Sequence, residues 1–248
     1  MKLVATIGFL SDTHGKHKAV EDRFGIPQCD ILVHAGDFTM LGSQKESMGF
    51  LEWFAALDVP YKVLVAGNHD IWFDSGGEKF ERLFSFGEIQ DRDARSLIPE
   101  GIIYLENESA VVKGIKFYGT PVQPQFKNWA FNVERDEARQ AAFEMIPEDT
   151  QILVTHCPPR GVLDTNIKGE NCGDKELALR IINLPNLKMN VFGHIHESRG
   201  VDIKGGITYI NATNVNRSYH PIHKPYVFQC FDGVQLIEKK KWQKLPHS

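Results

Sequence analysis

Cysteine is scarce in this chain of 248 residues, and Cys29, Cys157, Cys172 and Cys230 form no CxxC pair. Their spacing argues against a cysteine-rich structural zinc site and against a scaffold held together by many disulfides. We interpret the four cysteines as reduced thiols of a cytoplasmic protein, because disulfides are rare in that compartment.

Long apolar runs are also absent, and none approaches the roughly 20 residues that a membrane-spanning helix requires. Met1-Lys2 leads directly into the apolar segment 3–10 without the pattern of a signal peptide. The formal net charge of -4 provides no excess of positive charge for binding a long nucleic acid. We therefore expect neither a membrane nor a long nucleic acid as partner, and the sequence leaves the oligomeric state open.

The composition is that of an ordinary globular protein, with 42% hydrophobic and 24% charged residues. A chain of this length suffices for one large domain or two small ones. No internal repeat, low-complexity tract or long linker divides it. We therefore expect a single domain over residues 1–248.

Apolar, partly β-branched runs predict buried strands, and most of these runs end at polar residues. The strongest runs are 3–10, 30–35, 61–66, 152–154 and 189–192. Ser43 and Glu46 form a capping box, which predicts a helix between the second and third of these strands. Strands that alternate with helices indicate an α/β protein, in which functional residues gather at the carboxyl ends of the strands.

Further helices are expected over residues 78–86, from an Asn132 cap to about Ile146, and from an Asp174 cap to about Asn183. The stretch from Val201 to Lys239 is rich in strand-forming residues. We interpret it as the remainder of a second sheet.

In five short clusters spread along the chain, almost every residue with a lone pair is of a type that binds metals: a carboxylate, an imidazole or an amide oxygen. The clusters are Asp12-Thr13-His14, Gly36-Asp37, Gly67-Asn68-His69, Thr155-His156 and Gly193-His194-Ile195-His196. Each has a simpler explanation when taken alone; Asp37 could cap a helix, and Asn68 could occupy a left-handed turn. Together they provide carboxylates, imidazoles and an amide oxygen, a set that suits two divalent ions such as manganese, iron or zinc. A calcium site would use more carboxylates and few histidines.

This series, extended by Ser11, Gly15 and Asp70, resembles the full motif series of the calcineurin-like metallophosphoesterases. Segments 34–39, 66–69, 155–159 and 209–213 are similar to the metallophosphoesterase-domain-containing branch, whose members hydrolyse phosphodiesters including cyclic nucleotides. The resemblance implies an α/β fold in which two mixed β-sheets pack as a sandwich flanked by helices.

The resemblance also implies a role for each ligand residue. The first metal would be held by Asp12, His14, Asp37 and His196, and the second by Asp37, Asn68, His156 and His194. Asp37 would bridge the two ions. We expect two divalent ions, with manganese preferred and iron or zinc as alternatives.

His69 would not bind metal but would face the substrate and protonate the departing oxygen, after attack by a metal-bridging hydroxide. Many relatives orient this histidine with a second aspartate three residues after the bridging one, where this chain has Met40. Either another residue, such as Asp70 or Asp74, orients His69, or His69 is a weaker acid. Arg217 is a candidate contact for the phosphate, together with Asn68 and His69.

The sequence therefore favours an enzyme, a metal-dependent phosphodiesterase acting on a small nucleotide-like substrate. The alternatives are a phosphomonoesterase, including a protein phosphatase, a nuclease, or a metal-bearing scaffold without turnover. An aromatic group, Phe126, Trp129 and Phe131, could stack a base or simply pack the loop.

Overall fold

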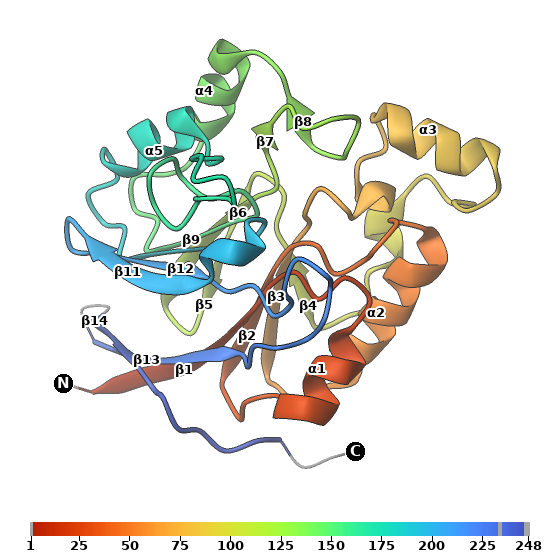
Figure 1. The fold of residues 1–248 in the computed structure, drawn as a ribbon. Coiled ribbons are helices and arrows are strands. Elements are labelled where there is room, and N and C mark those ends of the chain that lie inside the picture. Colours follow the sequence, from red (N-terminus) through yellow and green to blue (C-terminus); the bar gives the residue numbers. More distant parts are fainter. Residues whose placement is uncertain (1, 233–234, 246–248) are drawn as a thin grey trace.

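The computed structural model describes residues 2–232 and 235–245, which form two six-stranded sheets packed against each other (Figure 1). The first sheet has the order β14-β13-β1-β2-β3-β4. Its strands are β1 (Leu3–Leu10), β2 (Ile31–Ala35), β3 (Tyr61–Val65), β4 (Ile102–Tyr104), β13 (Tyr226–Phe231) and β14 (Gln235–Glu238). The four strands from β1 to β4 are parallel, whereas β13 pairs antiparallel with β1, and β14 pairs antiparallel with β13.

The second sheet has the order β11-β12-β10-β9-β6-β5. Its strands are β5 (Glu108–Val112), β6 (Ile115–Thr120), β9 (Ile152–Thr155), β10 (Met189–Phe192), β11 (Gly200–Lys204) and β12 (Ile207–Asn211). The four inner strands are parallel, and β5 and β11 close the two edges antiparallel. Two mixed sheets confirm the predicted fold class.

Side chains alternate between two cores along the central strands. In β2, Ile31 and Val33 pack into the core between the sheets, whereas Leu32 packs beneath the helices on the outer face. In β9, Ile152 and Val154 likewise face the other sheet, while Leu153 faces outward. Because both faces are buried, these strands read as continuous apolar runs in the sequence.

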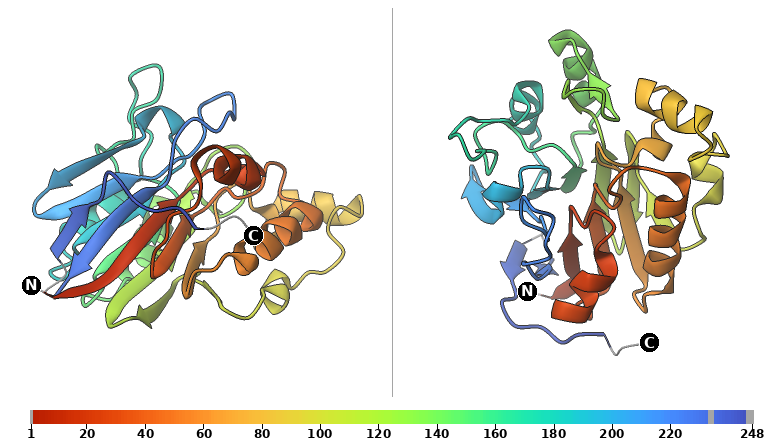
Figure 2. Two further views of the ribbon diagram at one scale, coloured as in Figure 1. Left: turned by 90° about the horizontal axis from the view of Figure 1, so that it is seen from below. Right: turned by 45° about the vertical axis from the view of Figure 1, so that its right-hand side comes forward.

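Helices cover the outer face of each sheet (Figure 2). The first sheet is covered by α1 (His17–Phe24), α2 (Gln44–Ala56) and α3 (Glu78–Ser85), and the second by α4 (Asp136–Glu144) and α5 (Lys175–Ile181). Short elements complete the fold: β7 (Gln123–Pro124), β8 (Asn132–Val133), η1 (Ile71–Phe73), η2 (Ala94–Leu97) and η3 (His196–Ser198). Within the described residues, every helix is too short or too polar to cross a membrane.

Most predicted helices form where expected, and the caps explain why. Ser43 and Glu46 make both hydrogen bonds of a capping box at the start of α2, and Asp174 accepts the Leu177 N–H at the start of α5. The predicted cap at Asn132 is wrong, because that residue pairs in β8 and α4 begins four residues later.

The end of the chain divides between the sheets, which corrects the expectation that all of it completes the second one. β11 and β12 join the second sheet, but β13 pairs with β1, with Phe228 opposite Ile7. This pairing joins residues more than 200 positions apart, so no local pattern marks it.

Candidate metal centre

Turns at the ends of the parallel strands carry the predicted ligands to one edge of the sandwich. Asp12 and His14 follow β1 with φ of 52° and 42°, and Asp37 follows β2 with φ of 55°. His194, after β10, has φ of 68°. Left-handed backbone is uncommon for residues other than glycine and gathers at functional sites. Four such residues at one edge therefore mark this edge as a site.

Glycines beside these turns allow the two sheets to approach closely. A Cβ at Gly36, whose φ is 97°, would lie 2.6 Å from Nδ1 of His156. A Cβ at Gly67 would collide with the Asp37 carboxylate, and one at Gly193 with the Asp12 carboxylate. Gly36, Gly67 and Gly193 are thus required by close packing around the ligands.

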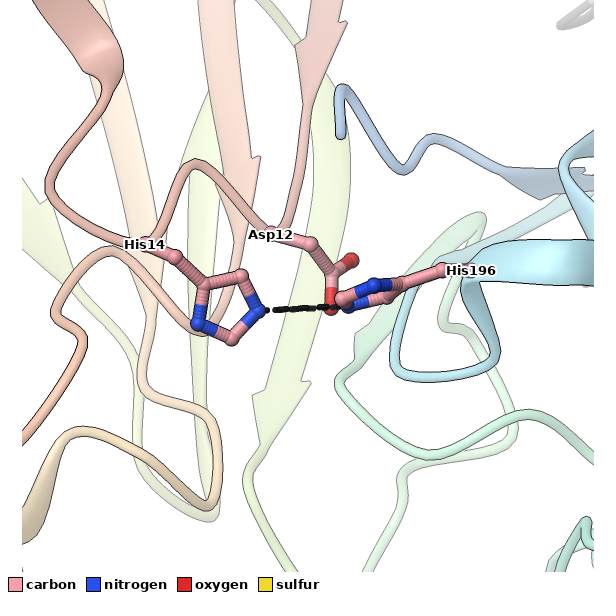
Figure 3. Close-up of side chains that lie close together, drawn as sticks. All are labelled: Asp12, His14 and His196. Carbon is pink, nitrogen blue, oxygen red and sulfur yellow. Dashed lines mark hydrogen bonds and ion pairs between the residues drawn. The ribbon is translucent and has the colours of Figure 1, made fainter. Parts of the chain in front are cut away.

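The first ligand cluster combines Asp12 and His14 from the first sheet with His196 from the second (Figure 3). Nε2 of His196 lies 3.2 Å from Nε2 of His14 and 3.3 Å from Oδ1 of Asp12. One ligand atom from each of the three residues lies within 4.8 Å of the others.

The second cluster combines Asp37 with His156 and His194 under the same 4.8 Å criterion. Nε2 of His156 lies 3.2 Å from Oδ2 of Asp37 and 3.2 Å from Oδ1 of Asn68. Oδ2 of Asp37 also lies 3.7 Å from Nε2 of His14, a member of the first cluster. The structure therefore brings all seven predicted ligands together, with Asp37 between the two groups.

Hydrogen bonds around the clusters orient the imidazoles as metal ligands require. Nδ1 of His156 donates to the Ala35 carbonyl at 2.9 Å, and Nδ1 of His196 to the Asn216 carbonyl at 3.2 Å. With the proton on Nδ1, each neutral ring presents the Nε2 lone pair to the cluster. Such a bond is lacking at His14, whose Nδ1 is buried and has no hydrogen-bond partner within the described structure. Converging lone pairs and carboxylates fit divalent cations.

The electrostatics of the clusters also suit cations. Burial lowers the pKa of His14 to about 4. Burial, together with the nearby charge of His156, lowers the pKa of His194 to about 3. Burial would lower the pKa of His156 too, but the charge and hydrogen bond of Asp37 raise it to about 9. Burial opposes ionisation of Asp37, yet the charge of His156 holds the pKa of Asp37 well below its usual value. A proton on His156 therefore partly balances the carboxylates, and a metal would displace it.

His69 lies beside both clusters, since His14, Asp37 and His69 also offer ligand atoms within 4.8 Å of one another. Its backbone N–H donates to Oδ1 of Asp37 at 2.7 Å. Its ring Nδ1 donates to the backbone carbonyl of Met40 at 2.7 Å, with the proton on that nitrogen. The main chain of Met40 thus takes the place of the missing aspartate side chain.

Neither Asp70 nor Asp74, the two candidate carboxylates, orients the His69 ring directly. Asp70 is buried beneath the site and accepts the backbone N–H groups of Gly67, Asp37 and Thr39, at 2.7 to 2.9 Å. Asp74 accepts the Phe131 N–H at 2.8 Å. Both carboxylates support the turns around the site.

A cavity of about 430 Å³ opens over the ligands and includes His69 in its wall. Arg217 also lines the cavity, and its guanidinium Nε lies 3.0 Å from Oε1 of Glu197. Phe126 lines the cavity, whereas Trp129 packs on His69 and Phe131 on the outer core of the first sheet.

Tyr219 is a wall residue that the sequence did not single out. Its ring meets His14 edge-on at a centroid distance of 4.8 Å, and its φ is 57°. The available sequence signal was Asn216, whose side chain accepts the N–H of Ser218 and of His220 and so builds the turn.

The sandwich and its paired ligand clusters define a metal-binding phosphoester hydrolase. Residues 5–198 match the family model described as calcineurin-like phosphoesterase, and the chain belongs to that family. It is 35% identical over 227 residues to the human metallophosphoesterase domain-containing protein 1, covering 88% of this chain and 68% of the relative. A UPF0046 protein of Caenorhabditis elegans is 32% identical over 219 residues, covering 88% and 73%. The chain thus falls in the metallophosphoesterase-domain-containing branch.

A solved structure supports the fold at much lower sequence identity. The phosphopantetheinyl hydrolase from Mycobacterium tuberculosis aligns with a TM-score of 0.57 at 18% identity, covering 98% of both chains. At this level of identity, the match shows a shared fold and nothing more.

Proposed function

We propose that this protein is a dimetal-dependent phosphodiesterase that hydrolyses a small, nucleotide-like diester within one domain spanning residues 1–248. The charge of the cavity wall carries this proposal. Among the described residues that line it, Arg217 is the only lysine or arginine, and Glu197 pairs with it. A monoester dianion would meet little positive charge beyond the metals, whereas a diester carries a single negative charge.

The residues of the two clusters would hold the ions. Asp12, His14, Asp37 and His196 would bind one, and Asp37, Asn68, His156 and His194 the other. Mixed imidazole and carboxylate donors support manganese, with iron or zinc as alternatives. When bound, two such ions activate the attacking water and neutralise charge on the phosphate.

His69 would act as the proton donor. A water that has released one proton to solvent forms a new bond from its oxygen to phosphorus, and the bond from phosphorus to the leaving oxygen breaks. His69, protonated on both ring nitrogens, gives its Nε2 proton to that oxygen and regains a proton from solvent. The bond from Nδ1 to the Met40 carbonyl leaves Nε2 for this transfer. Asn68 and Arg217 would contact the phosphate.

The cavity and the cysteines support the expected setting of the enzyme. A volume of about 430 Å³ suits a small molecule better than a long nucleic acid. All four thiols are free, in keeping with a reducing cytoplasm.

The test compares bis(p-nitrophenyl) phosphate with p-nitrophenyl phosphate, using metal-stripped protein with manganese added back. We expect kcat/KM to favour the diester by about tenfold or more, within the range that pocket contacts supply. A preference for the monoester would indicate a phosphomonoesterase. No turnover of either ester with two metals bound would indicate a metal-bearing scaffold without activity.

A matched variant tests the charge argument itself. Glu197→Gln releases Arg217 from its ion pair, so monoester turnover should rise relative to diester turnover. An unchanged ratio would show that the charge of this wall does not set the preference.

A further inference from the structure

The indole of Trp129 packs against the imidazole of His69. The two ring centroids lie 4.0 Å apart with an angle of 26° between the planes. Nζ of Lys79 lies 2.7 Å from the centroid of the same indole. Two groups so close cannot share one face, so Lys79 lies on the face opposite His69. The indole therefore has no free face on which a substrate base could stack.

The segment that carries Trp129 is anchored on both sides of the indole. The Ala130 N–H donates to the Asn68 carbonyl at 3.1 Å, which ties the segment to the residue before His69. Asn128 donates to Glu78 of α3 at 3.0 Å, and the loop between β7 and β8 lies beside α3 in Figure 1. These bonds hold the indole in place without using a side chain of either ligand cluster.

The hydrogen bond to Met40 alone does not fix the His69 ring. It places one ring atom, Nδ1, but leaves the plane of the imidazole free to tilt about that contact. Proton transfer requires the donor atom within hydrogen-bond reach and in the right direction. A flat partner at stacking distance supplies the missing restraint.

We propose that Trp129 is a positioning residue that fixes the plane of the His69 ring and directs Nε2 toward the leaving oxygen. With the Met40 carbonyl, it replaces the orienting carboxylate of related enzymes. This inference rests on the proposed function, in which His69 donates the proton. Trp129 does not line the cavity, so it acts through His69 and not on the substrate.

The dependence of rate on the leaving group tests this role. A good leaving group such as p-nitrophenolate departs without a proton, whereas an alkoxide needs one. In a series of methyl phosphodiesters with increasingly basic leaving groups, Trp129→Leu should lower kcat by about tenfold to 100-fold for the most basic group. The p-nitrophenyl ester should lose less than threefold, KM should stay constant, and Trp129→Phe should restore most of the rate.

NMR of the zinc-loaded protein gives a readout besides activity. The indole ring current should shift the His69 ring protons upfield in the wild type and in part in Trp129→Phe, but not in Trp129→Leu. The zinc content should stay at two per chain in all three proteins. If Trp129→Leu does not fold, Trp129→Met offers a flexible side chain that also lacks a flat face.

Trp53→Leu is a matched control. Trp53 packs against His17 in a tilted arrangement, with centroids 4.8 Å apart and planes at 37°, and neither residue lines the cavity. This variant removes a comparable indole–imidazole contact elsewhere and should lower thermal stability without changing the leaving-group dependence.

The outcomes separate this inference from the proposed function. An equal loss for all esters in Trp129→Leu, or an unchanged His69 signal, would overturn the positioning role. His69→Ala should retain both metals and show the steepest leaving-group dependence. If it loses metal or shows no such dependence, the proton-donor assignment fails, and the NMR shifts still decide whether Trp129 fixes the ring.

Discussion

The two sheets contribute different chemistry to the same cavity. The first sheet supplies both carboxylates, the amide oxygen of Asn68 and the imidazoles of His14 and His69, while the second supplies only imidazoles, those of His156, His194 and His196. Each ligand cluster nevertheless draws on both sheets. Neither sheet alone holds a complete set of ligands, so a bound ion would stabilise the packing of one sheet against the other.

The difference also explains the charge balance of the metal-free site. Asp12 and Asp37 are both buried, and neighbouring histidines of the second sheet favour their ionised forms. Buried carboxylates without cations are costly. The negative charge of these two carboxylates must therefore be balanced either by protons on histidines of the second sheet or by metal ions.

The largest expected effect comes from removing charge on the first sheet. Asp37→Asn keeps the shape of the side chain but loses the negative charge between the clusters. Metal ions stabilise the transition state by several kcal/mol, so we expect kcat/KM to fall about 10³-fold or more. Metal content measured beside activity should fall as well. A variant that keeps two metals would show that the second sheet can hold them without this charge.

The intermediate effect concerns protons on the second sheet. The pKa of His156 is raised to about 9 from 6.5, so its ion pair stabilises the metal-free protein below about pH 6.5. That contribution is lost as pH rises through about 9. The lowered pKa of Asp12 and Asp37 has the opposite sign: their contribution is present above about pH 4 and lost as pH falls further.

Metal binding should therefore stabilise the protein more at higher pH. An ion that displaces the proton of His156 gains about tenfold in affinity per pH unit below about pH 9. At saturating metal, each unit adds about 1.4 kcal/mol, or about 3–6 °C in Tm, for a chain of this size. Thermal melting with and without zinc at pH 6, 7 and 8 checks this. An equal shift at all three values would mean that His156 carries no proton to displace.

The parallel strands that end at ligands were the easiest part of the fold to predict. In the first sheet these strands are apolar runs that stop at a polar ligand, as at Gly36-Asp37, so strand and site share one local signal. The same signal marked His156 and His194 on the second sheet. The pairing of β13 with β1 was missed, because it joins distant segments whose local pattern fits either sheet.

Two features around His69 were out of reach for a related reason. Every residue has a backbone carbonyl, so nothing in the sequence marks that of Met40 as the partner of an imidazole. Trp129 lies 60 positions from His69, and its aromatic neighbours suggested a substrate platform instead. In both cases the contact depends on tertiary packing, which side-chain patterns do not encode.

The smallest expected effect is that of restoring the missing carboxylate on the first sheet. Met40→Asp places an acid where related enzymes have one, but the Met40 carbonyl already accepts from Nδ1 of His69 at 2.7 Å. A backbone acceptor remains after any substitution, so the new carboxylate would compete for a donor that is already bound. We expect kcat to change by less than about threefold, even for esters with basic leaving groups. A rise confined to those esters would show that the neutral Met40 carbonyl limits proton donation by His69. The first sheet would then lack a negative charge, beside His69, that would speed the reaction.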